Sequence, residues 1–126
     1  EVMANSDNVV RAGLTPKPVD VDLLVALTDG TPTPPPAVVP EREGAVTRYP
    51  APVHDFSLSR VDEGEAAFEA GPRIVLAAEA PASVQAGGAT LALAAGEAAF
   101  IPYSAGLATV TAAQGAYVVE VPGAHV

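Results

Sequence analysis

The chain has 126 residues and a mass of 12.6 kDa, which suits one domain with a core of its own. Its net charge of −9 disfavours nucleic acid and anionic membrane surfaces as partners, and no apolar run approaches the roughly 20 residues that span a bilayer. The absence of cysteine excludes disulfides and thiolate metal sites, and two histidines alone cannot make a zinc site, which takes three or four protein ligands.

Residues 1–30 contain one predicted helix, followed by a proline-rich connector at residues 31–44. The helix is indicated by apolar residues at helical spacing, Leu23, Leu24 and Leu27, and either Asp20 or Asp22 can cap its start. Residues 5–17 carry glycine, proline and two adjacent valines, so we expect a turn and an irregular loop there. The connector has five prolines within nine positions, which excludes both helix and sheet interior and predicts an extended segment.

Residues 45–126 are predicted to be β, because short apolar stretches alternate there with Gly- and Pro-containing turns. Eight strands in about 77 residues, without a long helix between them, indicate an antiparallel sandwich or small barrel. The turns include one at Glu63-Gly64. The predicted strands are 45–49, 56–61, 73–78, 82–86, 90–93, 98–101, 107–112 and 116–121.

The bulky apolar residues of the β region are expected to form its core. They are Phe56, Leu58, Phe68, Ile74, Leu76, Leu91, Leu93, Phe100, Ile101, Tyr117 and Val119. The carboxylates of this region, Glu79, Glu97 and Glu120, are expected to face solvent. Residues 1–30 have little to bury beyond four leucines, so we expect them to be less protected from proteolysis than the β region.

Three stretches of the β region, 71–76, 87–91 and 96–102, follow one another in an order that resembles the cupin jelly roll, where five residues separate a Gly from a Pro. Metal-binding cupins carry a His-x-His pair and a further His at positions that here read Ala77-Ala78-Glu79 and Leu107. The resemblance therefore implies a cupin-type jelly-roll β-sandwich that holds no metal, preceded by a short loop-helix segment.

The run Met3–Lys17 (MANSDNVVRAGLTPK), followed by Asp20-Val21, is similar to the signature of the type I phosphomannose isomerases. These are zinc-dependent enzymes that interconvert mannose 6-phosphate and fructose 6-phosphate by proton transfer between C1 and C2 through a cis-enediol. The resemblance implies that residues 1–30 belong to the catalytic region, 31–44 to a linker and 45–126 to a C-terminal metal-free cupin domain. The chain would then be a cytoplasmic fragment, inactive alone, that lacks its N-terminal catalytic domain.

The resemblance also implies roles for five residues of this run. Arg11 stands at the position of a catalytic arginine, and a permanently charged planar donor suits negative charge that develops on sugar oxygens. Lys17, the only lysine, would bind the sugar-phosphate substrate, and Ser6, Asp7 and Asn8 would support the loop beside the active site. Zinc would be bound by residues upstream of the chain, with no metal ligand in the chain itself.

Each of these roles has a plain structural alternative. Arg11 can pair with Asp7 four residues earlier, Lys17 can be a solvated surface lysine, and Ser6, Asp7 and Asn8 are typical of turns and caps. The corresponding alternative for the whole chain is a non-catalytic cupin-like β-sandwich that serves as a binding or oligomerisation module. That alternative explains the missing ligands but leaves the Met3–Lys17 run without a reason.

Overall fold

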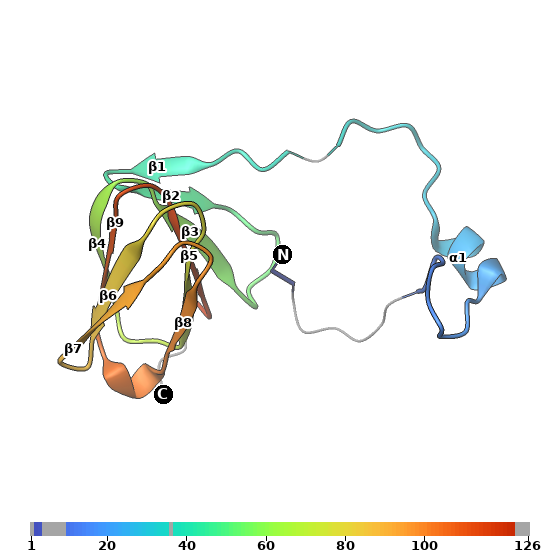
Figure 1. The fold of residues 1–126 in the computed structure, drawn as a ribbon. Helices are drawn as coiled ribbons and strands as arrows, with labels where there is room; N and C mark the ends of the chain where they lie inside the picture. Colours follow the sequence, from blue (N-terminus) through green and yellow to red (C-terminus); the bar gives the residue numbers. More distant parts are fainter. Residues whose placement is uncertain (1, 4–9, 36, 123–126) are drawn as a thin grey trace. The chain divides into compact units, whose positions relative to one another are not determined.

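The structure is a computed structural model that describes residues 2–3, 10–35 and 37–122. The chain divides into two compact units, one of Asn5–Ala37 and one of Val38–Val126 with Glu1–Ala4 (Figure 1). The first unit contains the single α-helix among the described residues, and the second contains all of their strands. The prediction of a mainly β sandwich preceded by a short loop-helix segment is confirmed.

Helix α1 spans Val21–Leu27, and Asp20 is its N-cap. The Asp20 carboxylate accepts a hydrogen bond from the Leu23 backbone N–H at 2.9 Å, which satisfies one of the free donors of the first turn. The helix ends where the Thr28 backbone N–H donates to the Leu24 carbonyl at 3.1 Å. The predicted helix is confirmed, with Asp20 rather than Asp22 as its cap. None of its residues is buried.

Ten strands form two antiparallel sheets. A six-stranded sheet has the order β1-β2-β3-β10-β5-β8, and a four-stranded sheet has the order β4-β9-β6-β7. The strands are β1 (Glu41–Glu43), β2 (Val46–Tyr49), β3 (Ser57–Val61), β4 (Gly64–Phe68), β5 (Arg73–Ala77), β6 (Ala82–Ala86), β7 (Ala89–Leu93), β8 (Ala98–Ile101), β9 (Ala108–Ala112) and β10 (Ala116–Glu120). A 3-10 turn, η1, occupies Tyr103–Ala105.

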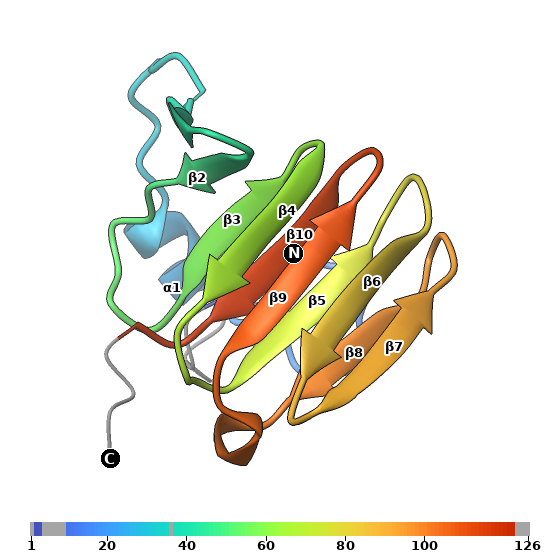
Figure 2. The same ribbon diagram turned by 90° about the vertical axis from the view of Figure 1, so that its left-hand side faces the viewer.

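The two sheets lie face to face, and the chain passes repeatedly between them (Figures 1 and 2). Strands neighbouring in a sheet, such as β10 between β3 and β5, are distant in sequence, as expected of a jelly roll. In Figure 2 the four-stranded sheet lies in front, and β2 extends past its edge. The larger sheet therefore has an overhang, formed by β1 and β2, that the smaller sheet does not cover.

All eight predicted strands are confirmed, each within one residue at either end. Two strands were missed. The prediction of a turn at Glu63-Gly64 was wrong in part, because β4 begins at Gly64, and β1 lies inside the segment predicted to be an extended connector. Strand β1 consists of three charged, exposed residues at a sheet edge, so its sequence carries none of the apolar alternation by which strands are recognised.

The core is built from smaller side chains than predicted. The largest fully buried side chains are all valines, Val61, Val75, Val84, Val110 and Val118, and six core alanines pack among them. Of the predicted core, Phe68, Leu93 and Ile101 are buried. Phe56, Leu58, Tyr117 and Val119 are only half-buried, and Ile74, Leu76, Leu91 and Phe100 are exposed.

The prediction failed there because bulk was taken as the sign of a core position. Successive residues of a strand face opposite sides of the sheet, and in β5 the valine, not the flanking isoleucine and leucine, faces inward. Leu91 faces the same side as the buried Val84, its partner across β6 and β7, but β7 is an edge strand. An edge position leaves Leu91 open to solvent.

Gly115 occupies the turn between β9 and β10 and has no room for a side chain. Its φ is +67°, and a Cβ built there would lie 2.5 Å from Nη2 of Arg60. The Arg60 guanidinium is held by Asp62, at 3.1 Å, and lies over the ring of Tyr117, 5.8 Å from its centroid. Arg60 can therefore make way for a side chain at Gly115 only by giving up those contacts.

We expect Gly115→Ala to lower the free energy of unfolding by about 2–3 kcal/mol, measured by urea denaturation. Gly88→Ala is the matched control, because Gly88 has φ +78° and nothing within 4 Å of its Cβ position. The control should cost only the backbone strain, about 1–2 kcal/mol. Equal losses in the two variants would show that Arg60 does not constrain this turn.

Candidate functional site

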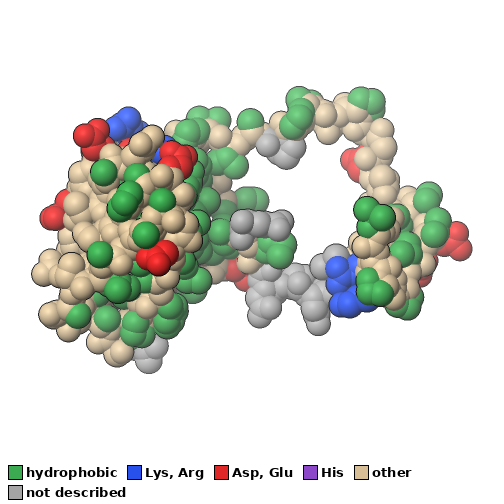
Figure 3. Space-filling model, in the orientation of Figure 1, with side chains coloured by type: hydrophobic (Ala, Val, Ile, Leu, Met, Phe, Trp, Pro, Cys, Tyr) green, Lys and Arg blue, Asp and Glu red, His purple; other side chains and the backbone are tan. Residues whose placement is uncertain are grey.

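The described part of the predicted substrate-binding segment, residues 10–20, has neither helix nor strand. Arg11 and Lys17 are both exposed, and they are the only basic residues of their unit. In Figure 3 the blue atoms of Lys and Arg gather on one part of this unit. The two candidate residues thus give one positive patch to a chain that is otherwise strongly acidic.

Two features shape the backbone between Arg11 and Lys17. Gly13 has φ +152°, and Leu14 has φ +50°, which is unusual for a residue with a side chain. Near the end of the segment, the Lys17 backbone N–H donates to the Thr15 hydroxyl at 3.2 Å, a local turn. The backbone here is shaped by local conformation and a local hydrogen bond, and the Leu14 side chain is fully exposed to solvent.

Ser6, Asp7 and Asn8, the other predicted site residues, lie outside the described residues. Their predicted support of the active-site loop, and the alternative pairing of Asp7 with Arg11, stay predictions. The structure thus describes two of the five candidates, Arg11 and Lys17. Both are exposed on the same segment, with five residues between them.

The interior of the sandwich is a second location for chemistry, because the resemblance places the metal of other cupins there. Ala77 is fully buried there, and Leu107 is exposed. Among the described residues, no group of three or more His, Asp or Glu could hold a metal ion. Zinc therefore does not fit the described part of this chain.

The interior does hold one charged side chain, that of Arg73 at the start of β5. It is 2% exposed; its Nε donates to the Gly71 carbonyl at 3.3 Å, and its Nη2 donates to the Glu69 carbonyl. Nη2 also lies 3.6 Å from Glu120, and the guanidinium lies over the Phe68 ring at 5.4 Å. Burial lowers the pKa of Arg73, whereas the charges of Glu120 and Glu69 oppose that shift.

The prediction that Glu120 faces solvent was therefore wrong. Glu120 stands opposite Arg73 in the β10–β5 register and on the inner face of the sheet, and Ser57 approaches it from β3 at 3.5 Å. Sequence reasoning could not pair two residues 47 positions apart without the strand register. The pair neutralises a charge that the sandwich has removed from water, which makes its role structural.

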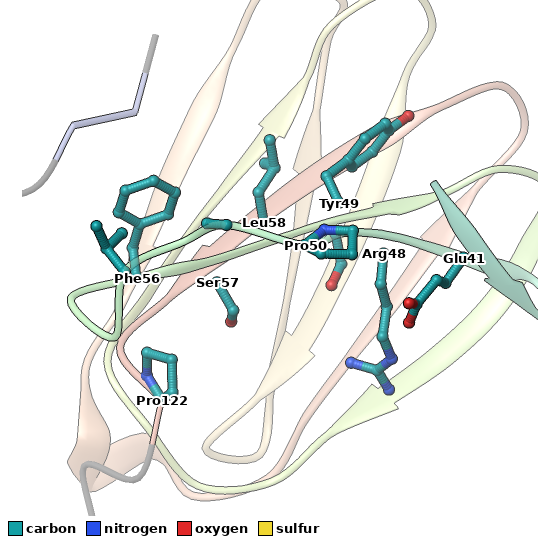
Figure 4. Close-up of a pocket in the computed structure, with 11 residues that line it drawn as sticks. Glu41, Arg48, Tyr49, Pro50, Phe56, Ser57, Leu58 and Pro122 are labelled. Atoms are coloured by element: carbon teal, nitrogen blue, oxygen red, sulfur yellow. The ribbon is translucent and has the colours of Figure 1, made fainter. Parts of the chain in front are cut away.

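A pocket of about 280 Å³ lies at the overhang of the six-stranded sheet (Figure 4). Arg48 and Glu41 face it from β2 and β1, and Ser57 faces it from β3, while Tyr49 and Leu58 point to the opposite side of the strands. Arg48 lies 3.8 Å from Glu43, and more than half of its side chain is exposed. The pocket is open and its charges are solvated, so its geometry indicates no catalytic group.

No helix among the described residues is long and apolar enough to cross a membrane. The fold defines the class of this chain: a jelly-roll sandwich of the cupin type, preceded in sequence by a short loop-helix unit.

Comparison with known proteins identifies relatives of this chain. The chain is 40% identical over 106 residues to the mannose-6-phosphate isomerase of Escherichia coli, a match of 80% of this chain and 27% of that protein. It is 46% identical over 68 residues to the mannose-6-phosphate isomerase of Bos taurus, covering 49% of this chain and 16% of that one. No family model matches.

A crystal structure of the Salmonella typhimurium mannose 6-phosphate isomerase, bound to substrate (f6p) and a zinc atom, matches this fold with a TM-score of 0.79. The match has 34% identity and covers 94% of this chain and 32% of that one. The predicted resemblance to phosphomannose isomerases is confirmed, and the chain is related to them over most of its own length. It spans about a quarter to a third of the length of the two bacterial enzymes.

Limited digestion with trypsin should separate the segment of Arg11 from the sandwich. We expect cleavage after Arg11 first, because that bond lies in exposed chain without regular hydrogen bonding, and after Arg73 last. Arg48 is the control, since its side chain is exposed but its backbone belongs to β2, and it should be cut slowly. The bond after Lys17 precedes Pro18 and is a poor trypsin site. Mass spectrometry measures how fast each bond is cut. Equal survival of the bonds after Arg11 and Arg73 would contradict the expectation that the Arg11 segment is less protected than the sandwich.

Proposed function

We propose that this chain is part of a zinc-dependent mannose-6-phosphate isomerase and carries two of its substrate-facing residues, Arg11 and Lys17. The proposal is supported by 40% identity over most of the chain to an enzyme of that name, and by the likeness to a structure bound to substrate and zinc. The reaction interconverts mannose 6-phosphate and fructose 6-phosphate, by moving a proton between C1 and C2 through a cis-enediol. Residues 1–30 would belong to the catalytic region and 45–126 to the C-terminal cupin domain, with a linker between them.

In this proposal Arg11 acts at the reacting carbons. The enediol intermediate carries negative charge on the oxygens of C1 and C2, and these oxygens lie side by side. A guanidinium presents parallel N–H donors in a plane and stays charged at every working pH, so it can hold both oxygens at once. The exposure of Arg11 leaves its donors available to a substrate.

Lys17 acts at the other end of the substrate. An ammonium group is a point charge with three donors, which suits the phosphate of a sugar phosphate. The turn at Thr15 and the following proline restrict the backbone from which the Lys17 side chain extends. A positive patch in a chain of net charge −9 also directs an anionic substrate toward this segment.

The zinc of this enzyme would be held by residues outside the chain, since the described residues do not fit it. The chain therefore contributes substrate contacts without a metal ligand, and its activity would require the rest of the enzyme. Ser6, Asp7 and Asn8 would hold the segment beside the active site.

Arg11→Ala, introduced into the longer enzyme, should lower kcat by roughly 10²–10³-fold, the usual cost of removing one donor that stabilises charge in the transition state. The measurement is the rate of fructose 6-phosphate formation from mannose 6-phosphate. Arg48→Ala is the control, because Arg48 is a solvated arginine of the sandwich and its loss should leave kcat unchanged. An unchanged kcat in Arg11→Ala would remove Arg11 from the mechanism.

Lys17→Ala should raise KM for mannose 6-phosphate by roughly tenfold and change kcat less, since a phosphate contact is made equally in the ground and transition states. Lys17→Arg keeps the charge and should recover most of the loss. The rise in KM should shrink as salt is added, because salt screens an exposed charge. A KM unaffected by Lys17→Ala would mean that another residue binds the phosphate.

A further inference from the structure

The outer face of the six-stranded sheet carries the bulky apolar residues that the sequence suggested for the core. The strand register places them in one row across five strands: Tyr49, Leu58, Val119, Ile74 and Phe100. A second row runs beside it: Thr47, Arg60, Tyr117, Leu76 and Ala98. We call these two rows the outer apolar face.

This face is open over much of its extent. Phe100 is 65% exposed and Ile74 is 50% exposed, while Tyr49, Leu58 and Val119 of the same row are half-buried. Figure 3 shows hydrophobic side chains gathered along the side of the sandwich on which the six-stranded sheet lies, to the right in that view. Large apolar side chains that are adjacent and exposed are typical of an interaction surface.

The face also contains a shallow groove of about 160 Å³. Carbon atoms line almost all of it, contributed by Phe56, Pro72, Ile74, Phe100, Val119 and Val121 together with the stems of Arg73 and Glu120. Arg73 forms an ion pair with Glu120 at 3.6 Å, and Arg60 forms one with Asp62 at 3.1 Å at the other end of the face. Nη1 of Arg73 and Nε of Arg60 have no hydrogen-bond partner among the described residues. A partner that packs on this face would therefore bury mainly apolar surface, and the charged groups at its ends are already in ion pairs.

We infer that the outer apolar face is the surface on which this sandwich packs against the remaining part of the longer isomerase, an inference that rests on the proposed function. Beyond the matched segment, the relatives contain roughly two to three times as much chain again, enough to supply a covering surface. A second copy fits less well. The sandwich, residues 38–126, has ten acidic residues and four arginines, so two copies would bring two charges of −6 together.

The chain contains no cysteine of its own, so single cysteines can report which surface is covered. Phe100→Cys and Ile74→Cys probe the outer apolar face. Leu91→Cys is the matched control, since Leu91 is 49% exposed on edge strand β7 of the other sheet. Each variant is made in the 126-residue chain and in the longer isomerase, and the rate of maleimide labelling of that peptide is measured by mass spectrometry. All three replaced side chains are exposed, and thermal unfolding checks that each variant folds.

We expect all three thiols to react quickly in the 126-residue chain. In the longer isomerase, Ile74→Cys and Phe100→Cys should react at least tenfold more slowly, while Leu91→Cys keeps its rate. Equal rates for Ile74→Cys in the two proteins would overturn the inference. So would slow labelling already in the 126-residue chain, which would mean that a second copy or residues 10–35 cover the face. If Leu91→Cys also became slow in the longer isomerase, the protection would not be specific to the outer apolar face, and this result would overturn the inference as well. The isomerase assay of the unmodified longer protein tests the proposed function separately.

Discussion

The close packing of small side chains between the two sheets is the constraint on which the rest of the structure depends. The fully buried positions of the described chain hold valine and alanine, and these fill the interior without needing large residues. The fully buried Ala77 stands where the resemblance to metal-binding cupins would place a ligand. Phe68, Leu93 and Ile101 are buried, whereas most of the bulky apolar residues of the six-stranded sheet lie on its outer face.

One charged pair interrupts this apolar interior. Arg73 and Glu120 face each other across β5 and β10 at one end of the sandwich, and the Phe68 ring packs against the guanidinium. A pair of this kind adds little net stability when complete, but removing one partner leaves a buried charge and costs several kcal/mol, on the order of 3–5. The pair is therefore compatible with the β5–β10 register, in which the two residues stand opposite each other, and adds little to the stability of the fold.

Local signals in the sequence were enough to predict most of the secondary structure. Gly and Pro mark the strand ends so consistently that eight strands were predicted within one residue. Strand β1 was missed because its residues are all charged and its pairing with β2 is a property of the edge, not of its composition. The core was mispredicted because β5 and β10 carry apolar residues on both faces, and alternation cannot then show which face is buried.

The candidate site was predicted on different grounds. Arg11 and Lys17 were singled out by the family signature, and neither periodicity nor composition would have chosen them. The pairing of Glu120 with Arg73 shows the reverse case, since it depends on the register of distant strands, which no local pattern encodes.

Arg11 and Lys17 lie on a segment that supplies very little of its own order. Fixing the backbone of one residue costs about 1–2 kcal/mol of conformational entropy. Residues 10–20 offset this cost with only one cap and one turn hydrogen bond, because nearly all of their side chains are exposed. A guanidinium stabilises a transition state only if it is held in place before the charge develops. The contacts that hold Arg11 must then come from protein outside this segment.

The outer apolar face of the sandwich leads to the same requirement. The interior of the sandwich is closely packed, whereas large apolar side chains on this one surface are exposed. A single body of protein, the remainder of the isomerase, would meet both needs. The sandwich would then contribute to catalysis by docking, without a catalytic group of its own.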